Sequence, residues 1–244
     1  MGQGAWQVDL FGGAGPQDAN EPHGARSDVA IVAAHRPGSL PQHLTASNEH
    51  YTPEWIASAA RVTMGSIDLD PASCTQANQI IRAERFYTQA DDGLTAPWFG
   101  RCFLNPPYGW TDHKPDWSPA KRNPLGYSQK ELWTQRVIRD IAHHEIHQAV
   151  TVVTATSGDP WFEVFARCGR ALCLPPRIQF WGPDGESSGQ PGSSAIFYHC
   201  DPRHDHGDRF FEVFGCHGMT SDLRKWTFRP SIAIELQILQ LTRK

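Results

Sequence analysis

Short apolar runs alternate with amphipathic segments along most of the chain. Residues 149–154 are apolar and rich in β-branched side chains, which is typical of a strand at the centre of a sheet. Ser128 and Glu131 have the spacing of a capping box, and the apolar positions after them predict a helix to about residue 144. Helices are also predicted over 55–62, 72–83 and 161–168, short strands over 67–71, 101–104, 171–174, 177–181, 194–199 and 210–214, and either type over 231–241.

The helix starts and stops have identifiable signals. Thr52 followed by Pro53 predicts a cap and a proline at the first helical position. Asp159 and Pro160 predict the same for the helix over 161–168, which Gly169 would close. These signals strengthen the helix assignments on both sides of the central strand.

This alternation of strands and helices predicts an α/β fold with a mostly parallel central sheet and helices on both faces. In such sheets, ligands bind at the carboxyl ends of the strands. Asp70 and Asn105 both stand at the ends of predicted strands. We therefore expect their side chains to share one crevice.

The regular pattern does not extend over the whole chain. Residues 1–47 are rich in Gly, Pro, Ala and His and show no sustained period, so we interpret them as a loosely ordered N-terminal extension. Residues 48–244 form the predicted domain. Within it, the proline-rich stretch 110–127 and the Gly- and Ser-rich stretch 182–193 are expected to be loops.

Charge is distributed unevenly. The 244 residues carry a net charge of −4, which does not suggest a nucleic-acid binder. From residue 112 to 139, however, basic side chains outnumber acidic ones; they are Lys114, Lys121, Arg122, Lys130, Arg136 and Arg139 against Asp112, Asp116 and Glu131. Such a strip is sufficient for phosphate contacts, and it also fits a solvated loop and helix face.

Composition excludes several other classes of protein. No run approaches the ~18 apolar residues of a membrane span, and no secretion signal is recognisable, so a cytoplasmic location without a membrane is expected. Six scattered cysteines do not form a disulfide framework. The spacing of the histidines and cysteines over 199–217 fits no zinc finger, so no metal site is predicted. We also expect no obligate protein partner.

The most informative motif is Asn105-Pro106-Pro107-Tyr108, which follows an apolar strand. An exocyclic amine on a planar ring is a poor nucleophile because its lone pair is conjugated, so a methyl-transferring site needs acceptors for both N–H bonds. The Asn105 side-chain carbonyl and the Pro106 backbone carbonyl are rigidly held acceptors, and Tyr108 offers a flat face for a base. The tetrapeptide also fits a plain strand terminator with Asn as a turn former.

Together with its context, this motif resembles the phage-type DNA N6-adenine methyltransferases, the phage Dam-like family. The matching segments are Tyr51-Thr52-Pro53, 67–73, Ala77-Asn78, 85–88, 91–94 with Trp98, 105–108, 177–180 and 191–195. The resemblance implies a Rossmann-like fold that uses S-adenosylmethionine to methylate adenine in DNA, with the target nucleotide flipped out of the duplex. It also implies a bacterial or phage-infected host cell.

The resemblance implies roles for single residues. The catalytic loop would be Asn105, Pro106, Pro107 and Tyr108. Residues expected beside the cofactor are Tyr51, Thr52, Pro53, Asp68, Asp70, Pro71 and Asp91 or Asp92. Because the cofactor and catalytic motifs precede the largest insertion, we expect the loops 110–127 and 182–193 to recognise DNA, with contacts from Lys114, Lys121, Arg122 and Arg177. One departure concerns the cofactor side, where residues 71–74 replace the glycine-rich loop of many relatives in the wider superfamily.

Two other interpretations of function remain open. The same tetrapeptide suits another planar nitrogen, such as cytosine N4, an RNA base or a protein glutamine. A nucleic-acid-binding module could also keep the fold without turnover, although such a module would not need the amine acceptors of Asn105 and Pro106. Identifying the methylated product separates these interpretations.

Overall fold

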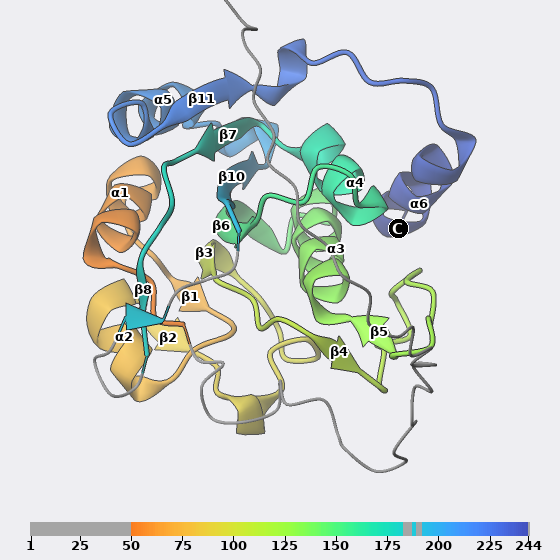
Figure 1. Ribbon diagram of the computed structural model, residues 1–244, viewed down its shortest axis with the longest axis horizontal. Helices are drawn as coiled ribbons and strands as arrows, with labels where there is room; N and C mark the ends of the chain where they lie inside the picture. Colours follow the sequence, from red (N-terminus) through yellow and green to blue (C-terminus); the bar gives the residue numbers. More distant parts are fainter. Residues whose placement is uncertain (1–49, 183–186, 189–191, 244) are drawn as a thin grey trace, which may run out of the picture. The chain divides into compact units, whose positions relative to one another are not determined.

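The computed structural model describes residues 50–182, 187–188 and 192–243. The predicted extension over 1–47 lies outside these residues, as does much of the loop over 182–193. The central feature is a seven-stranded sheet with the strand order β11-β7-β10-β6-β3-β1-β2 (Figure 1). Its strands are β1 (Leu69–Asp70), β2 (Arg85–Phe86), β3 (Gly100–Leu104), β6 (Ile146–Thr154), β7 (Ala171–Leu174), β10 (Ser194–Cys200) and β11 (Met219–Asp222).

The sheet is mostly parallel, which confirms the predicted fold class. Strands β2, β1, β3 and β6 are parallel neighbours. Strand β10 is antiparallel to β6 and to β7, and β11 is antiparallel to β7, so β7 runs with the parallel set while β10 and β11 run against it. Because β1, β2 and β3 are parallel neighbours, their carboxyl ends meet at one edge of the sheet.

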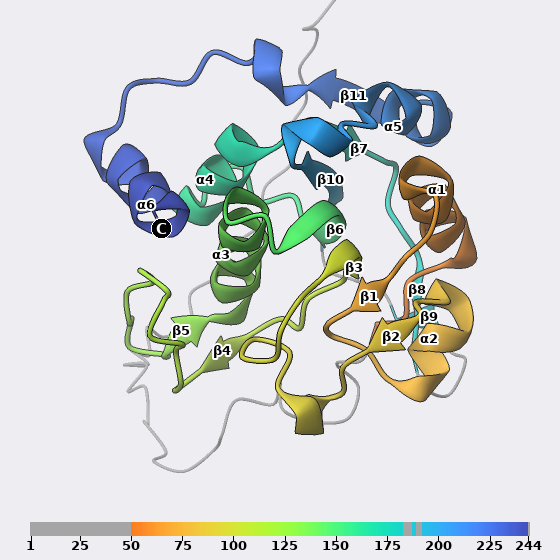
Figure 2. The same cartoon turned by 180° about the vertical axis from the view of Figure 1, so that it is seen from behind.

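Helices cover both faces of this sheet (Figures 1 and 2). On one face lie α1 (Glu54–Met64), α2 (Thr75–Ile81) and α5 (Gly207–Phe214). On the other face lie α3 (Gln129–Ala142) and α4 (Pro160–Cys168), and α6 (Ile232–Thr242) packs against these two helices. Among the described residues, no helix combines the length and apolar character of a bilayer span. The helices and the sheet together form a three-layer α/β fold.

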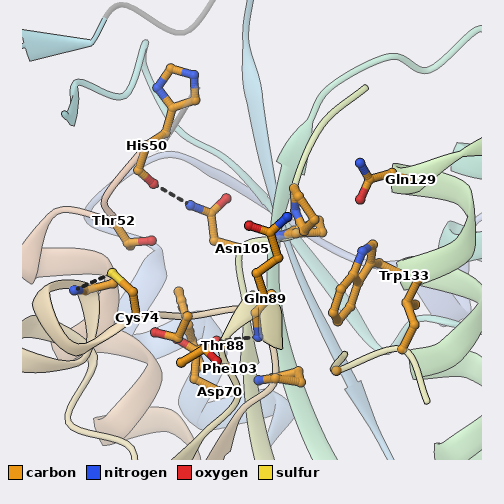
Figure 3. A pocket seen from close by; sticks show the side chains of 18 of the residues that line it. His50, Thr52, Asp70, Cys74, Thr88, Gln89, Phe103, Asn105, Gln129 and Trp133 are labelled. Atoms are coloured by element: carbon orange, nitrogen blue, oxygen red, sulfur yellow. Dashed lines mark hydrogen bonds between the residues drawn. The ribbon is translucent and has the colours of Figure 1, made fainter. Parts of the chain in front are cut away.

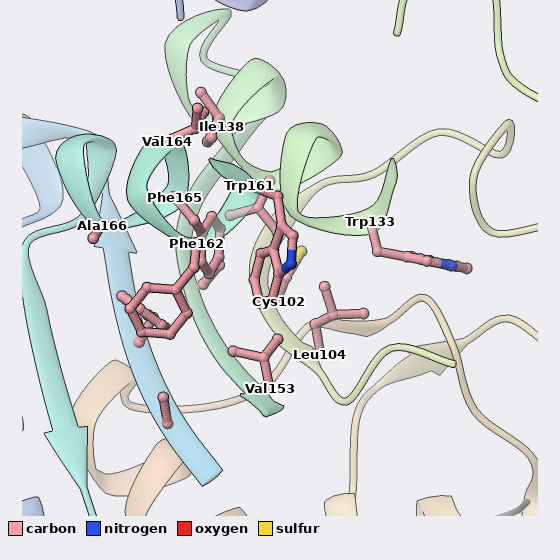
Figure 4. Packing of buried hydrophobic residues seen from close by; sticks show 14 of the residues in the cluster. Cys102, Leu104, Trp133, Ile138, Val153, Trp161, Phe162, Val164, Phe165 and Ala166 are labelled. Atoms are coloured by element: carbon pink, nitrogen blue, oxygen red, sulfur yellow. The ribbon is translucent and has the colours of Figure 1, made fainter. Parts of the chain in front are cut away.

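Two apolar cores fill the spaces between the sheet and its helices. Alternate residues of β3 enter different cores, because successive side chains of a strand point to opposite faces. Cys102 and Leu104 pack with Trp133, Trp161 and other residues of α3 and α4 (Figure 4). Phe103, between them, packs in the core that includes α1 and α5. The strand that leads into the tetrapeptide is therefore anchored on both sides.

The structure corrects one predicted strand and the start of one predicted helix, and it decides the type of a third segment. Residues 210–214 form the end of helix α5, not a strand, because Phe210 and Phe214 are one turn apart and pack their rings together at 4.5 Å in the core. Pro53 is the N-cap of α1 instead of its first helical residue, so Thr52 lies before the helix. The C-terminal segment, for which the sequence allows either type, is helix α6, and the Ser231 side chain caps it.

The start of α3 differs partly from the predicted capping box. The Ser128 hydroxyl accepts from the Glu131 amide, as expected. The Glu131 carboxylate does not return to Ser128 but accepts from the side chains of Gln135 and Gln237. Since Gln237 belongs to α6, this carboxylate holds the C-terminal helix against α3.

The proline-rich stretch 110–127, named the insertion, is closed by a short hairpin. Strands β4 (Trp110–Thr111) and β5 (Tyr127–Ser128) pair at its base, where Trp110 lies opposite Ser128. A second pair, β8 (Phe180–Trp181) with β9 (Ser187–Ser188), lies near the start of α1 through a bridge between Tyr51 and Trp181. Both pairs stand outside the seven-stranded sheet.

Candidate functional site

A cavity of about 460 Å³ opens at the edge of the sheet where β1, β2 and β3 end (Figure 3). Asp70 ends β1, and Asn105 directly follows β3. Both line the cavity, so the structure brings together the two side chains that sequence reasoning assigned to one crevice. The other sequence-predicted residues that line it are Tyr51, Thr52, Pro71, Asp92, Pro106, Pro107 and Tyr108.

The amide of Asn105 is held by one hydrogen bond. Its Nδ2 donates to the backbone carbonyl of His50 at 2.8 Å. Its Oδ1 is buried and has no hydrogen-bond partner among the described residues. Leaving a buried acceptor unsatisfied disfavours the fold by ~1–3 kcal/mol. The acceptor at the cavity wall is thus available to a ligand with an N–H group.

The His50 carbonyl is itself positioned by a segment far away in the sequence. The next residue, Tyr51, exchanges two backbone hydrogen bonds with Trp181 of β8, at 2.7 and 3.2 Å. The His50 ring meets the ring of Phe180 edge-on, with the centroids 6.2 Å apart. Strand β8 therefore sets the orientation of Asn105 through the main chain at residues 50 and 51.

The rest of the tetrapeptide forms the wall beside Asn105. Pro106 is buried and Pro107 is exposed, while Tyr108 is partly buried. Gly109 has a φ of +98°, which lets the chain turn away directly after Tyr108. The Pro106 carbonyl is fixed by its ring and by its neighbour, so a second acceptor stands next to the Asn105 side chain in the chain.

Lys130 lies close to the Tyr108 ring. Its Nζ is 6.0 Å from the Tyr108 ring centroid and 5.4 Å from that of Trp161, and it donates to the Thr154 hydroxyl at 3.1 Å. Burial lowers the pKa of the Lys130 ammonium, and the nearby Asp159 carboxylate opposes that shift. The tyrosine face that could support a planar ring is therefore bordered by a positive charge.

Asp70 is the buried carboxyl group of the cavity. The Ala72 amide donates to its Oδ1 at 3.2 Å. Burial raises the pKa of Asp70 to about 7, and the hydrogen bond from Ala72 opposes this shift. A cationic ligand would favour the ionised form, so this side of the cavity is suited to positive charge.

Residues 92–96 form a loop on the same side; because the sequence analysis expects Asp91 or Asp92 beside a cofactor, we name it the cofactor loop. Asp92 lines the cavity and accepts from the Thr95 hydroxyl at 2.9 Å. A Cβ atom at Gly93 would lie 1.9 Å from the carbonyl oxygen of Pro71, so only glycine permits this approach. The Gly93 carbonyl accepts from the buried indole of Trp98 at 2.7 Å. The loop is thereby held against the turn that follows Asp70.

Three residues expected beside the cofactor do not line the cavity: Pro53, Asp68 and Asp91. Asp68 accepts from the Arg101 guanidinium at 2.8 and 2.6 Å; burial alone would raise its pKa, but these hydrogen bonds lower it. Asp91 accepts from the amide and hydroxyl of Thr88 and closes a capping box at the short helix Gln89–Asp91. Both carboxylates are engaged within the fold and lie outside the cavity lining, so we do not propose them as cofactor ligands.

The four residues expected to contact DNA lie away from the cavity lining. Lys114 donates to the Ser118 carbonyl at 2.8 Å, and Arg122 pairs with Asp112 at 2.8 Å. Lys121 and Arg177 are exposed, the first in the insertion and the second between β7 and β8. The insertion reaches the cavity through Thr111.

Several lining residues were missed by sequence reasoning. They come from segments outside the tetrapeptide and the expected cofactor residues: His50, Ala72, Ser73, Cys74, Ala77, Ile81, Thr88, Gln89, Gly93, Leu94, Phe103, Thr111, Gln129 and Trp133. Some of them stand within or next to matching motifs, which is a usable signal. Gln129 and Trp133, one turn apart on α3, carried no such signal, because only the packing of α3 brings them to the cavity (Figure 3).

The histidine- and cysteine-containing segment 199–217 takes part in packing. His199 is buried, with Nε2 2.9 Å from the Phe165 carbonyl, and its ring stacks on that of Phe165. Within residues 50–182, 187–188 and 192–243, no three His, Cys, Asp or Glu side chains are grouped closely enough to hold a metal ion.

Comparison with solved structures gives one distant likeness. A protein from Listeria monocytogenes, described as a class I S-adenosylmethionine-dependent methyltransferase, is 13% identical with a TM-score of 0.41; the match covers 64% of this chain and 61% of that one. Nothing about this site follows from a likeness at that level. Among curated proteins, no match was found.

Comparison with protein families is more informative. The family model for DNA N-6-adenine-methyltransferase (Dam) matches residues 43–198, which is more than half of the chain. That span contains every residue that lines the cavity, from His50 to Trp133, and also β8, which positions Asn105 through residues 50 and 51. A match that covers both the cavity and its support shows that the chain belongs to the DNA N-6-adenine-methyltransferase (Dam) family.

Proposed function

We propose that this methyltransferase transfers a methyl group from S-adenosylmethionine to the N6 amine of adenine in DNA. The observation that carries the proposal is the buried Asn105 Oδ1, an acceptor without a partner among the described residues at the wall of the cavity. Buried polar atoms are nearly always hydrogen-bonded, so an exception in a cavity points to a ligand donor. The family to which the chain belongs supports the N6 amino group of adenine as that donor.

Asn105 and Pro106 activate the amine. The carbonyl oxygens of Asn105 and Pro106 accept hydrogen bonds from the two N–H groups of the amine. These hydrogen bonds concentrate electron density on the nitrogen as it becomes tetrahedral. Because His50 already holds the Asn105 amide, little reorganisation is needed when the amine arrives. Tyr108 supports the plane of the base and keeps the amine directed at the two acceptors.

The opposite side of the cavity fits the cofactor. S-adenosylmethionine supplies an electrophilic methyl group on a sulfonium when it is bound. Asp70 and Asp92 would hold its polar and positively charged parts, and Tyr51, Thr52 and Pro71 complete that side of the lining. The buried carboxyl of Asp70, beside an apolar wall, matches a ligand that combines positive charge with a flat ring system.

Adenine within a duplex cannot bring N6 into such a cavity, so we propose that the nucleotide is flipped out of the helix. The insertion would then face the DNA. Trp110 and Leu125 are apolar yet 44% and 63% exposed on it, and Lys121 and Arg122 supply positive charge nearby in the sequence. These four side chains are our candidates for contacts with the bases and phosphates around the flipped nucleotide.

A product-identification assay tests the proposed function. The protein is incubated with radiolabelled S-adenosylmethionine and, separately, duplex DNA, single-stranded DNA, RNA and a protein mixture, and each product is digested and identified. N6-methyladenine from DNA is the expected result. Label on cytosine N4, on RNA or on glutamine would support the alternative activities, and binding of DNA without any label transfer would indicate a catalytically silent module.

The Tyr108 ring is expected to contribute ~1–3 kcal/mol to binding of the target base through stacking. Tyr108→Ala should therefore weaken binding of adenine-containing DNA in the presence of S-adenosylhomocysteine, whereas Tyr108→Phe should bind like the wild type. Fluorescence anisotropy with labelled DNA measures both variants. Equal affinity of the alanine variant and the wild type would remove Tyr108 from the base site.

Cofactor binding is expected to depend on pH through Asp70. In the free protein this carboxyl is protonated below about pH 7, and a positively charged cofactor binds more tightly to the ionised form. Below pH 7 the affinity should fall by up to tenfold per pH unit, because one proton must be released on binding; above pH 7 it should be constant. Calorimetric titration with S-adenosylmethionine from pH 5.5 to 8.5 measures this dependence. Asp70→Asn should abolish it, and an unchanged slope in that variant would assign the titration to another group.

A further inference from the structure

Helix α3 carries an arginine that contacts both the cofactor loop and the insertion. Arg136 is buried, and its Nε pairs with the fully buried Asp140 at 2.5 Å. Its two terminal nitrogens donate to the carbonyls of Leu94 and Ala96, the second at 3.0 Å. The guanidinium is thus hydrogen-bonded to the backbone of the cofactor loop at two points.

The same guanidinium contacts the insertion. It lies 5.2 Å from the ring centroid of Trp98, which holds the Gly93 carbonyl, and 5.8 Å from that of Trp117 in the insertion. A second contact joins α3 to the insertion through the neighbouring residues: the buried Ser118 hydroxyl, next to Trp117, donates to Oε1 of Gln135, next to Arg136, at 2.5 Å. The cofactor loop and the insertion therefore share one buried cation.

We propose that Arg136 is a positioning residue that couples the cofactor loop to the insertion, so that cofactor and DNA each bind more tightly when the other is present. The inference rests on the proposed function, in which the cofactor loop holds the cofactor and the insertion faces DNA. A displacement of Trp117 on DNA binding changes the cation–π contact with Arg136, and the planar guanidinium passes that change to the carbonyls of Leu94 and Ala96.

Only arginine provides this connection. The guanidinium is rigid and planar, so it holds several donors in one plane and offers a flat surface to two aromatic rings, whereas a lysine ammonium is a single point of charge. Arg136→Lys keeps the charge beside Asp140 but removes the fork to the two carbonyls. Trp117→Leu keeps Arg136 and the cofactor loop intact and removes the ring of the insertion that contacts Arg136 and, at 5.7 Å, Arg139. The two variants interrupt the coupling at different places.

The chain offers a matched control on α4. Arg167 pairs with Glu163 at 2.6 Å, donates to the Arg229 carbonyl, and lies 4.9 Å from the ring of Phe228. Its environment resembles that of Arg136 in kind, but none of these partners lines the cavity or belongs to the insertion. Arg167→Lys therefore reproduces the local chemistry of the substitution without touching the site.

The experiment measures binding of S-adenosylhomocysteine by calorimetry, with and without an adenine-containing duplex of mixed sequence. In the wild type the duplex should tighten this binding about fivefold or more. Arg136→Lys and Trp117→Leu should bring that factor close to one, while Arg167→Lys should keep it. Hydrogen exchange of residues 92–96 provides the second readout and should become faster in Arg136→Lys but not in Trp117→Leu in the absence of DNA.

An unchanged coupling factor in Trp117→Leu, or no coupling in a wild type that binds the duplex, would overturn the inference. Unaltered exchange of residues 92–96 in Arg136→Lys would equally contradict it. Failure of the proposed function has a different signature, because the wild type would then place no methyl group on DNA adenine in the product assay.

Discussion

Asn105→Ala is expected to lower the rate of DNA methylation by about 100- to 1,000-fold and to leave S-adenosylmethionine binding nearly unchanged. The substitution removes the buried Oδ1 acceptor, and loss of one preorganised hydrogen-bonding group aimed at developing charge has an effect of this size. Cofactor binding should persist because Asp70, Asp92 and the turn after β1 remain. Single-turnover transfer of labelled methyl groups measures the rate, and calorimetry measures binding.

A matched control for Asn105→Ala is Gln76→Ala, which also removes a side-chain amide but from an exposed position on α2 outside the cavity. This variant should methylate at the wild-type rate. Thermal unfolding of Asn105→Ala should be recorded as well, because the substitution leaves the His50 carbonyl without its Nδ2 donor. A folded Asn105→Ala protein with full activity would contradict the assignment of the amine acceptor.

Gly93→Ala is expected to weaken cofactor binding by at least about tenfold. The new methyl carbon would lie 1.9 Å from the Pro71 carbonyl oxygen and 3.0 Å from the Trp133 ring, and the first of these is backbone that cannot rotate away. Inserting a methyl group into a tightly packed contact disfavours the structure by ~1–3 kcal/mol. We expect the cofactor loop to move instead of the sheet, so the loss should appear in cofactor affinity.

Gly158→Ala is the control for Gly93→Ala, since a Cβ atom at Gly158 meets no other atom within 4 Å. Its affinity for S-adenosylmethionine and its unfolding temperature should equal those of the wild type. Should Gly93→Ala bind the cofactor as well as Gly158→Ala does, the contact between Gly93 and Pro71 would have no part in shaping the site.

Much of the candidate site was predictable because its chemistry is local in the chain. The tetrapeptide holds two acceptors and an aromatic ring within four residues, so no long-range contact is needed to recognise it. The expectation that Asp70 and Asn105 share a crevice came from a general property of parallel strands, whose carboxyl ends meet at one edge. Both side chains line the same cavity.

Other assignments could not be made from the sequence. Asp68 and Asp70 are two residues apart in one motif, yet Asp68 pairs with Arg101 outside the cavity while Asp70 is buried in its lining. In a strand, side chains two residues apart point to the same face, so the sequence suggests the same environment for both. Strand β1 begins at Leu69, however, so Asp68 lies outside it and this rule does not apply. The error at 210–214 has a similar cause, because aromatic residues favour strands until their packing partners are known.

The order of residues in this chain determined its α/β class, the strand ends at Asp70 and Asn105 and the acceptors of the tetrapeptide, since these depend on neighbouring residues and on rigid prolines. Only the tertiary structure decided which way the Asn105 amide faces, because its Nδ2 donates to the carbonyl of His50, which lies 55 residues earlier in the chain. It also decided that α3 joins the cofactor loop to the insertion. Both outcomes depend on contacts between distant segments, and such contacts leave no period or motif in the sequence.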